Sequence, residues 1–218
     1  MTRDQVLLCL LIPVAYLLGS IPFGLIVGLA KGVDPRKAGS GNIGATNVGR
    51  LLGGRYFALV FTLDLLKSLV PMLGAAWILR GGNYDRLTYV LWLLVGFAAI
   101  VGHMFPIYLG FKGGKGVATA AGVVLGLFPY YTLPAIGSIV LWLIVFAIWR
   151  YVSLASMLAA ISLPVFFLSV ALACRWDPMG QRLPLLVFLI VVAGLVVFRH
   201  RSNIARLRAG TEHRFVKA

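Results

Sequence analysis

Long uncharged segments, separated by short polar connections, make up most of the chain. Five segments have no charged residue: Gln5–Ala30, Leu87–Phe111, Gly116–Trp149, Tyr151–Cys174 and Leu183–Phe198. A sixth, Tyr56–Leu79, contains only Asp64 and Lys67 as charged residues. Since about 20 apolar residues suffice for a helix to cross a bilayer, the pattern predicts an all-α integral membrane protein. No linker or repeat divides the chain, so we expect residues 1–218 to form one transmembrane domain.

The segment Gly116–Trp149 decides the number of spans, because it is long for one helix and short for two. Its "FPYYTLP" stretch, with Pro129 and Pro134, favours a break and hence a bundle of seven transmembrane helices. That topology puts fourteen Lys and Arg residues on one side of the membrane and five on the other, whereas six spans would give nine and ten. Cytoplasmic loops are enriched in Lys and Arg, so we predict an external amino terminus and a cytoplasmic carboxyl terminus. The first half, Gly116–Phe128, would then be a short helix whose small residues permit close packing.

Composition limits the classes of partner. The chain is 61% hydrophobic and 12% charged, with a formal net charge of +14. Orientation in the membrane and attraction to anionic lipid headgroups account for most of that charge, and no soluble basic domain is present to bind nucleic acid. The six acidic residues are scattered and form no set of metal ligands. We therefore expect membrane lipids as partners, with no nucleic acid, metal or cofactor.

The first predicted cytoplasmic loop contains "GSGNIGATNVGR", residues 39–50. Its G-x-G-x-x-G spacing is not a Rossmann signal, because no strand precedes it. Glycines allow tight turns and expose backbone N–H groups, which form concave anion-binding nests, and Arg50 can grip two phosphate oxygens. The plainer alternative is that the glycines only make turns. The candidate ligand-binding residues are Gly39, Ser40, Gly41, Asn42, Thr46, Asn47 and Arg50.

The second loop, "GHMFPIYLGFKGGKGVAT", covers residues 102–119. It is not a Walker A motif, because Gly116 follows Lys115 where Ser or Thr should stand. A helix beginning near Val117 would direct its first N–H groups and its positive dipole end toward a bound phosphate. The candidates are Lys112, Gly113, Gly114, Lys115 and Gly116, while His103 is interpreted as a structural hydrogen-bonding residue.

Two later cytoplasmic segments add polar residues. In "RYVSLAS" we expect Ser153 to cap a helix, with anion contact as the second possibility. In "RHRSNIARLRAGTEHRF", His200, Asn203 and Arg206 would share one face if the helix continued past Phe198. Glu212, the only glutamate, is predicted to pair with one of the arginines.

Asp64 and Lys67 lie three residues apart inside a predicted span. Charges at this depth are costly and normally face the interior of the bundle. We expect a structural internal ion pair, which is compatible with bracing the polar site.

These four motifs together resemble the bacterial acyl-phosphate:glycerol-3-phosphate acyltransferases (PlsY), in order and along nearly the whole chain. The resemblance implies transfer of an acyl group from acyl phosphate to the 1-hydroxyl of sn-glycerol 3-phosphate, giving lysophosphatidic acid and phosphate. It also implies a multi-pass protein of the bacterial inner membrane with a cytoplasmic active site. By resemblance, Ser40, Arg50, His200 and Asn203 serve activity, the glycines around Lys115 bind glycerol phosphate, and Glu212 maintains structure. Ser68 departs from the family pattern, where glycine is expected.

An acyl phosphate is already activated, so the protein mainly has to orient the reactants and neutralise charge. Our hypothesis is that Arg50 and Lys115 hold phosphate groups while Ser40 and Asn203 orient substrate oxygens. His200 or a substrate phosphate oxygen would accept the hydroxyl proton. A transporter of organic phosphates is the alternative, but such proteins place their sites near the midplane. The sequence does not set the oligomeric state, and a monomer is the default expectation.

Overall fold

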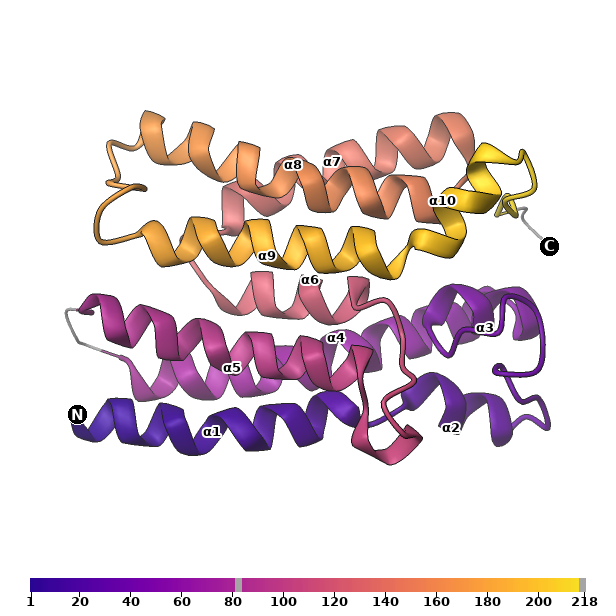
Figure 1. Ribbon diagram of the computed structural model, residues 1–218, viewed down its shortest axis with the longest axis horizontal. Helices are drawn as coiled ribbons and strands as arrows, with labels where there is room; N and C mark the ends of the chain where they lie inside the picture. Colours follow the sequence, from indigo (N-terminus) through magenta and orange to yellow (C-terminus); the bar gives the residue numbers. More distant parts are fainter. Residues whose placement is uncertain (81–83, 216–218) are drawn as a thin grey trace. The chain divides into compact units, whose positions relative to one another are not determined.

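The computed structural model describes residues 1–80 and 84–215, which form helices and no strand (Figure 1). The elements are α1 (Arg3–Ser20), α2 (Phe23–Leu29), α3 (Ala45–Leu52), α4 (Gly54–Ile78), α5 (Arg86–Met104), η1 (Ile107–Leu109), α6 (Val117–Gly126), α7 (Thr132–Trp149), α8 (Val152–Ala173), α9 (Leu183–Arg199) and α10 (Arg201–Arg208). The all-α class is confirmed. The predicted break in the segment 116–149 is also present, since α6 ends at Gly126 and α7 begins at Thr132.

Within these described ranges, 5 helical stretches are long and apolar enough to cross a membrane. They are Arg3–Leu29, Gly54–Ile78, Arg86–Leu109, Thr132–Trp149 and Val152–Ala173. A sixth is added if α9 and α10, which are bent by 57° relative to each other, count as one span. The apolar helix α6 has 10 residues and falls short of a full span. The protein is therefore an integral membrane protein, and its seven-span topology stays a prediction.

Contacts divide the chain into two compact units. Unit 1 comprises residues 1–82 and 94–126, and unit 2 comprises residues 83–93 and 127–218. The helix α5 contributes to both units. Each unit is described by itself, and the organisation as one domain remains a prediction.

Glycines allow the helices of unit 1 to pack backbone against backbone. A Cβ atom on Gly122 of α6 would lie 2.2 Å from the Leu65 carbonyl oxygen of α4, and one on Gly126 would lie 2.4 Å from Met72. Between α1 and α5, a Cβ on Gly19 would lie 2.2 Å from the carbonyl oxygen of Ala99. These approaches confirm that the small residues of α6 permit close helix packing.

The first apolar segment consists of two helices, although together they make up one candidate span, Arg3–Leu29. The helix α1 ends at Ser20, and α2 begins at Phe23 after an extended Ile21. Ile21 precedes Pro22, and a residue before proline is disfavoured in the helical region. At this break the carbonyl oxygen of Ile21 accepts a hydrogen bond from Lys67 of α4 at 2.8 Å.

In unit 2, α7, α8 and α9 pack around buried aromatic side chains. Tyr131, at the start of α7, is fully buried and donates its hydroxyl to the carbonyl oxygen of Leu185 in α9 at 2.7 Å. Its ring meets Phe167 of α8 edge to face. The three helices are thereby fixed to one another at this end of the unit.

Candidate active site

Asn47, in the first turn of α3, organises the first glycine loop. Its side-chain Nδ2 donates to the carbonyl oxygens of Pro35, Ala38 and Asn42 at 2.8–3.1 Å, and its Oδ1 accepts from the backbone N–H of Ser40 at 2.8 Å. The residue is 2% exposed. The amide that we assigned to substrate binding is thus engaged with the loop itself, and the structure gives it a shaping role.

The turns of this loop require glycine at two positions. Gly39 and Gly41 have φ values of 60° and 69°, in the left-handed region that glycine adopts without a steric penalty. Gly44 is extended and precedes α3, and its N–H donates to Oδ1 of Asn42 at 2.9 Å. The prediction of tight glycine turns is confirmed. Ser40, Thr46 and Arg50 are partly exposed around this frame, and their contact with an anion stays a prediction.

The second glycine loop folds back over the end of α5. The N–H of Gly113 donates to the carbonyl oxygen of Met104 at 3.2 Å, and that of Gly114 donates to the carbonyl oxygen of His103 at 3.0 Å. These two amides therefore close the loop onto α5, and a role of Gly113 and Gly114 in binding phosphate stays a prediction. Gly116 has a φ of 81°, and α6 begins at Val117 as predicted.

Close packing on His103 explains why glycine occupies positions 113 and 114. A Cβ atom on Gly113 would lie 2.1 Å from the carbonyl oxygen of His103, and one on Gly114 would lie 2.1 Å from its ring Nε2. Neither residue has room for a side chain. Lys112 is exposed and Lys115 is partly exposed beside this frame.

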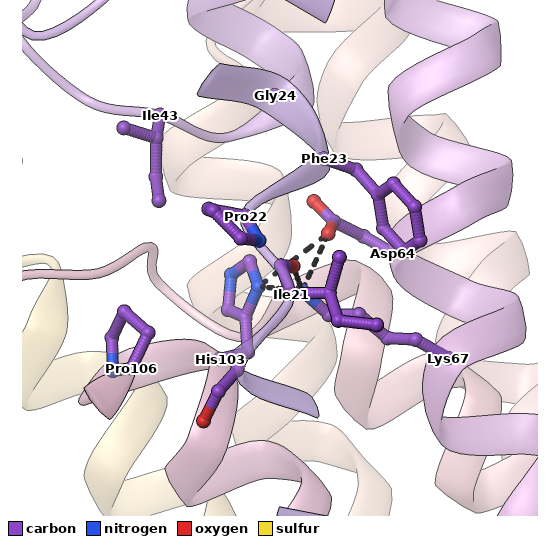
Figure 2. Close-up of a pocket in the computed structure, with 10 residues that line it drawn as sticks. Ile21, Pro22, Phe23, Gly24, Ile43, Asp64, Lys67, His103 and Pro106 are labelled. Atoms are coloured by element: carbon purple, nitrogen blue, oxygen red, sulfur yellow. Dashed lines mark hydrogen bonds and ion pairs between the residues drawn. The ribbon is translucent and has the colours of Figure 1, made fainter. Parts of the chain in front are cut away.

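A buried charged cluster lies at the α1–α2 break in unit 1. Lys67 Nζ lies 2.7 Å from Oδ1 of Asp64, which confirms the predicted ion pair. The same ammonium donates to the carbonyl oxygen of Ile21 at 2.8 Å and lies 2.9 Å from Nδ1 of His103 (Figure 2). Sequence reasoning foresaw the pair but missed both additional partners.

A small pocket opens beside this cluster. It is lined by residues of the α1–α2 break, of the first loop, of α4 and of the end of α5: Ser20, Ile21, Pro22, Phe23, Gly24, Ile43, Asp64, Lys67, His103 and Pro106 (Figure 2). Both loop regions therefore contribute to its wall. None of the residues that we assigned to substrate or catalysis lines it.

In unit 2, the carboxylate of Glu212 accepts hydrogen bonds from three side chains, one in α8 and two in α10. Its Oε1 accepts from the hydroxyl of Ser153 at 2.8 Å and from Nδ2 of Asn203 at 2.6 Å, and its Oε2 accepts from Nε of Arg206 at 2.8 Å. The predicted tie between Glu212 and an arginine is confirmed. Burial opposes ionisation of this carboxyl, but the hydrogen bonds from Asn203, Ser153 and Arg206 outweigh it and hold its pKa below the ordinary value.

Ser153 does not cap α8. The helix begins at Val152, its N-cap position is Tyr151, and no side-chain cap is formed there. Ser153 lies inside the first turn and turns its hydroxyl toward Glu212. The capping prediction is therefore wrong. The alternative was contact with an anion, and the anion that Ser153 contacts is the carboxylate of Glu212.

His200 marks the bend between α9 and α10, where we had expected a continuous helix. Its Nδ1 lies 2.7 Å from the carbonyl oxygen of Val196, and because a carbonyl only accepts, Nδ1 carries the hydrogen. His200 and Asn203 are each 3% exposed. The structure thus brings Ser153, Asn203 and Glu212 together in unit 2, and Ser40, Arg50 and Lys115 lie in unit 1.

Within residues 1–80 and 84–215, no group of three or more His, Cys, Asp or Glu side chains is placed to hold a metal ion. The charged residues within the motifs at residues 39–50 and 102–119 are the cations Arg50, Lys112 and Lys115. This donor set suits an anionic ligand such as a phosphate.

Comparisons with known proteins agree with the motifs. Residues 9–210 match the family model described as glycerol-3-phosphate acyltransferase. The chain is 48% identical to the glycerol-3-phosphate acyltransferase of Aquifex aeolicus over 203 residues, covering 92% of this chain and 95% of that protein. It is 47% identical to the one from Geobacter sulfurreducens over 208 residues, covering 94% and 96%.

Two crystal structures of PlsY (YgiH), an integral membrane glycerol 3-phosphate acyltransferase, resemble the structure over its whole length. The glycerol 3-phosphate form has a TM-score of 0.82 at 44% identity and covers 96% of each chain. The lysophosphatidic acid form has a TM-score of 0.80 at the same identity and covers 96% of this chain and 95% of that one. On its sequence, its fold and the two glycine loops, this chain belongs to the glycerol-3-phosphate acyltransferase family.

Proposed function

We propose that the protein transfers an acyl group from acyl phosphate to the 1-hydroxyl of sn-glycerol 3-phosphate, releasing lysophosphatidic acid and phosphate. This is the entry step of bacterial phospholipid synthesis. The observation that carries the proposal is the 44% identity, over 96% of the chain, to a PlsY structure described in its glycerol 3-phosphate form. The acyl-phosphate donor rests on the motif resemblance, and the cations Arg50, Lys112 and Lys115 support the binding of phosphate-bearing substrates.

In this proposal the cations of unit 1 bind the phosphate groups. Arg50 lies in the last turn of α3, and Lys115 directly precedes Gly116 and the start of α6. The first N–H groups of α6 have no intrahelical acceptor and favour an anion at this end. Ser40 and Thr46 orient substrate oxygens, and Lys112 adds a flexible positive charge. Preorganised donors of this kind stabilise the charge that develops in the transition state.

The reaction needs one proton acceptor. The 1-hydroxyl oxygen attacks the acyl carbonyl carbon, the bond from that carbon to the phosphate oxygen breaks, and phosphate leaves with the electron pair. Because Nδ1 of His200 donates to Val196, its Nε2 is the ring nitrogen that would take the hydroxyl proton, unless the substrate phosphate takes it. Asn203, whose amide is oriented by Glu212, would hold the reacting hydroxyl.

We further propose seven spans in the bacterial inner membrane, with the loops and the tail on the cytoplasmic side. The asymmetric distribution of Lys and Arg supports this topology. The shortness of α6, with 10 residues, agrees with a span that is shielded from lipid by its neighbours. A single copy carries all the residues assigned here, so we expect a monomer to be active.

The test is phosphate release from acyl phosphate and glycerol 3-phosphate by purified protein, without metal, CoA or carrier protein. We expect turnover, and a loss in kcat of roughly 100- to 1000-fold in Lys115→Ala and Ser40→Ala. Lys37→Ala, an exposed lysine outside the assigned set, is the matched control. A requirement for acyl-CoA would refute the donor assignment, and vesicle uptake of glycerol 3-phosphate without turnover would favour the transporter.

A further inference from the structure

We propose that Lys67, acting through His103, is a positioning residue for the second glycine loop. This inference rests on the proposed function of that loop in binding glycerol 3-phosphate. Lys67 is 6% exposed and His103 is 5% exposed, so neither serves as a surface ligand. Both belong to unit 1 together with the loop.

The Lys67 ammonium has three close polar neighbours, one in an ion pair and two in hydrogen-bonding contacts. These are Oδ1 of Asp64 at 2.7 Å, the carbonyl oxygen of Ile21 at 2.8 Å and Nδ1 of His103 at 2.9 Å. For Nδ1 to accept, its lone pair must face Lys67, and the ring hydrogen must therefore be on Nε2. The direct distance from Nδ1 to Asp64 is 3.6 Å, too long for a hydrogen bond. Lys67 is thus the group that orients the imidazole.

The opposite edge of the His103 ring, at Nε2, contacts the second glycine loop. Gly114 packs against Nε2, with no space for a Cβ atom, and its N–H donates to the His103 carbonyl at 3.0 Å. A rotated ring would collide with this glycine, so ring orientation and loop path are coupled. Lys115 is the next residue, and a small displacement of a binding group is costly in a positioned site.

Lys67 also fixes the segment that supports the first loop. It satisfies the carbonyl of Ile21 at the α1–α2 break. Three residues later, a Cβ on Gly24 would lie 1.8 Å from the carbonyl oxygen of Ile43 in the first loop. Both residues line the pocket beside Lys67 (Figure 2). The Lys67 ammonium therefore contacts Ile21, which precedes the segment packed on the first loop, and His103, which packs on the second.

Two amide variants of His103 separate positioning from simple packing. Asn places its oxygen near the position of Nδ1, whereas Gln places its terminal group near the position of Nε2. We expect His103→Asn to keep KM for glycerol 3-phosphate within about twofold of wild type. His103→Gln should raise it roughly 10- to 100-fold, while KM for acyl phosphate stays within about twofold. Equal KM values for glycerol 3-phosphate in the two variants would overturn the proposal.

Two controls complete the experiment. Tyr131→Phe removes a buried hydrogen bond in unit 2 and should lower Tm without changing KM for glycerol 3-phosphate. Lys115→Ala tests the loop itself: if it leaves both kcat and KM for glycerol 3-phosphate unchanged, the proposed function of the loop fails. If only His103→Gln leaves KM unchanged, the positioning role alone fails.

If the variants do not fold, a measurement on the wild-type protein tests whether the second glycine loop is held against α5. Hydrogen exchange of the segment 113–114 should be as slow as that of α4, because its two amides donate to carbonyl oxygens at the end of α5. Exchange in this segment at the rate of an open loop would overturn the coupling.

Discussion

The two buried polar clusters of this protein are opposite in charge and similar in construction. In unit 1, the Lys67 ammonium forms an ion pair with Asp64 and hydrogen-bonding contacts with Ile21 and His103. In unit 2, the Glu212 carboxylate accepts from three donors. In each case the central ion joins segments that are distant in the sequence. Close partners of opposite charge and hydrogen bonds to polar groups make the burial of an ion tolerable.

The clusters differ in their surroundings. Lys67 lies within α4, a candidate membrane span, whereas Glu212 follows α10, near the end of the described chain. Its partner Arg206 is partly exposed, so water moderates that interaction. We therefore expect the cluster in unit 1 to resist pH and salt but to be sensitive to substitution, and the cluster in unit 2 to respond to both.

The largest expected effect is that of Lys67→Met. It leaves the carboxylate of Asp64 buried without its cation, which costs about 3–5 kcal/mol of folding stability. Chemical unfolding of the detergent-solubilised protein measures this loss. The double variant Asp64→Leu with Lys67→Met should recover most of it, because an apolar pair carries no desolvation cost. A double variant as unstable as the single one would contradict this account of the cluster.

Glu212→Gln should have the next largest effect, about 1.5–3 kcal/mol, because it weakens hydrogen bonds to a charged acceptor. The lowered pKa of Glu212 also sets a pH dependence. Its contribution is fully present above the unfolded pKa of about 4.3. It is lost as the pH falls through the folded pKa.

Thermal unfolding measured between pH 7 and pH 3 checks this sign. The wild-type protein should lose stability below about pH 4.3, and the Glu212→Gln variant should lose less over the same interval. Parallel curves for the two proteins would mean that other carboxyl groups govern the acid transition.

Ser153→Ala should cost less, about 1 kcal/mol, since Glu212 keeps its bonds to Asn203 and Arg206. Ser169→Ala, on the same helix, is the matched control, because its hydroxyl is exposed and bonds only within α8. The difference in Tm between the two variants measures the contact with Glu212. Equal Tm values would show that this contact adds nothing.

The smallest effect is expected for Asp34→Asn. Asp34 pairs with Arg36 at the surface of the first loop, and the side-chain hydrogen bond from Arg36 lowers its pKa to about 2. Solvent screens such pairs, so we expect no measurable change in Tm at neutral pH. A clear destabilisation would show that this exposed pair supports the loop as the buried clusters do.

The sequence predicted features that depend on neighbours along the chain. The helical class, the break before Thr132, the start of α6 at Val117, the pair of Asp64 with Lys67 and the pairing of Glu212 with an arginine are all local. Spacing on a helix or across a short turn carries this information.

The missed features depend on contacts across the fold. His103 reaches Lys67 over 36 positions, and Ser153 reaches Glu212 over 59. The periodicity of apolar residues along a helix carries no information on contacts between residues so far apart in the sequence. The role of Asn47 could have been anticipated, because asparagine side chains often bond to nearby backbone in loops. The bend at His200 could not be predicted from local sequence, because no proline or glycine lies next to it.

Residues 212–215 of the tail are docked against the rest of unit 2. Besides the contacts of Glu212, the N–H of Phe215 donates to the carbonyl oxygen of Arg150 at 2.8 Å, and its ring meets that of Phe146. Trimming the chain before Glu212 would strip Ser153 and Asn203 of an acceptor that they share. The basic tail should therefore be kept when the protein is truncated or tagged, because its contacts hold the turn between α7 and α8 in place.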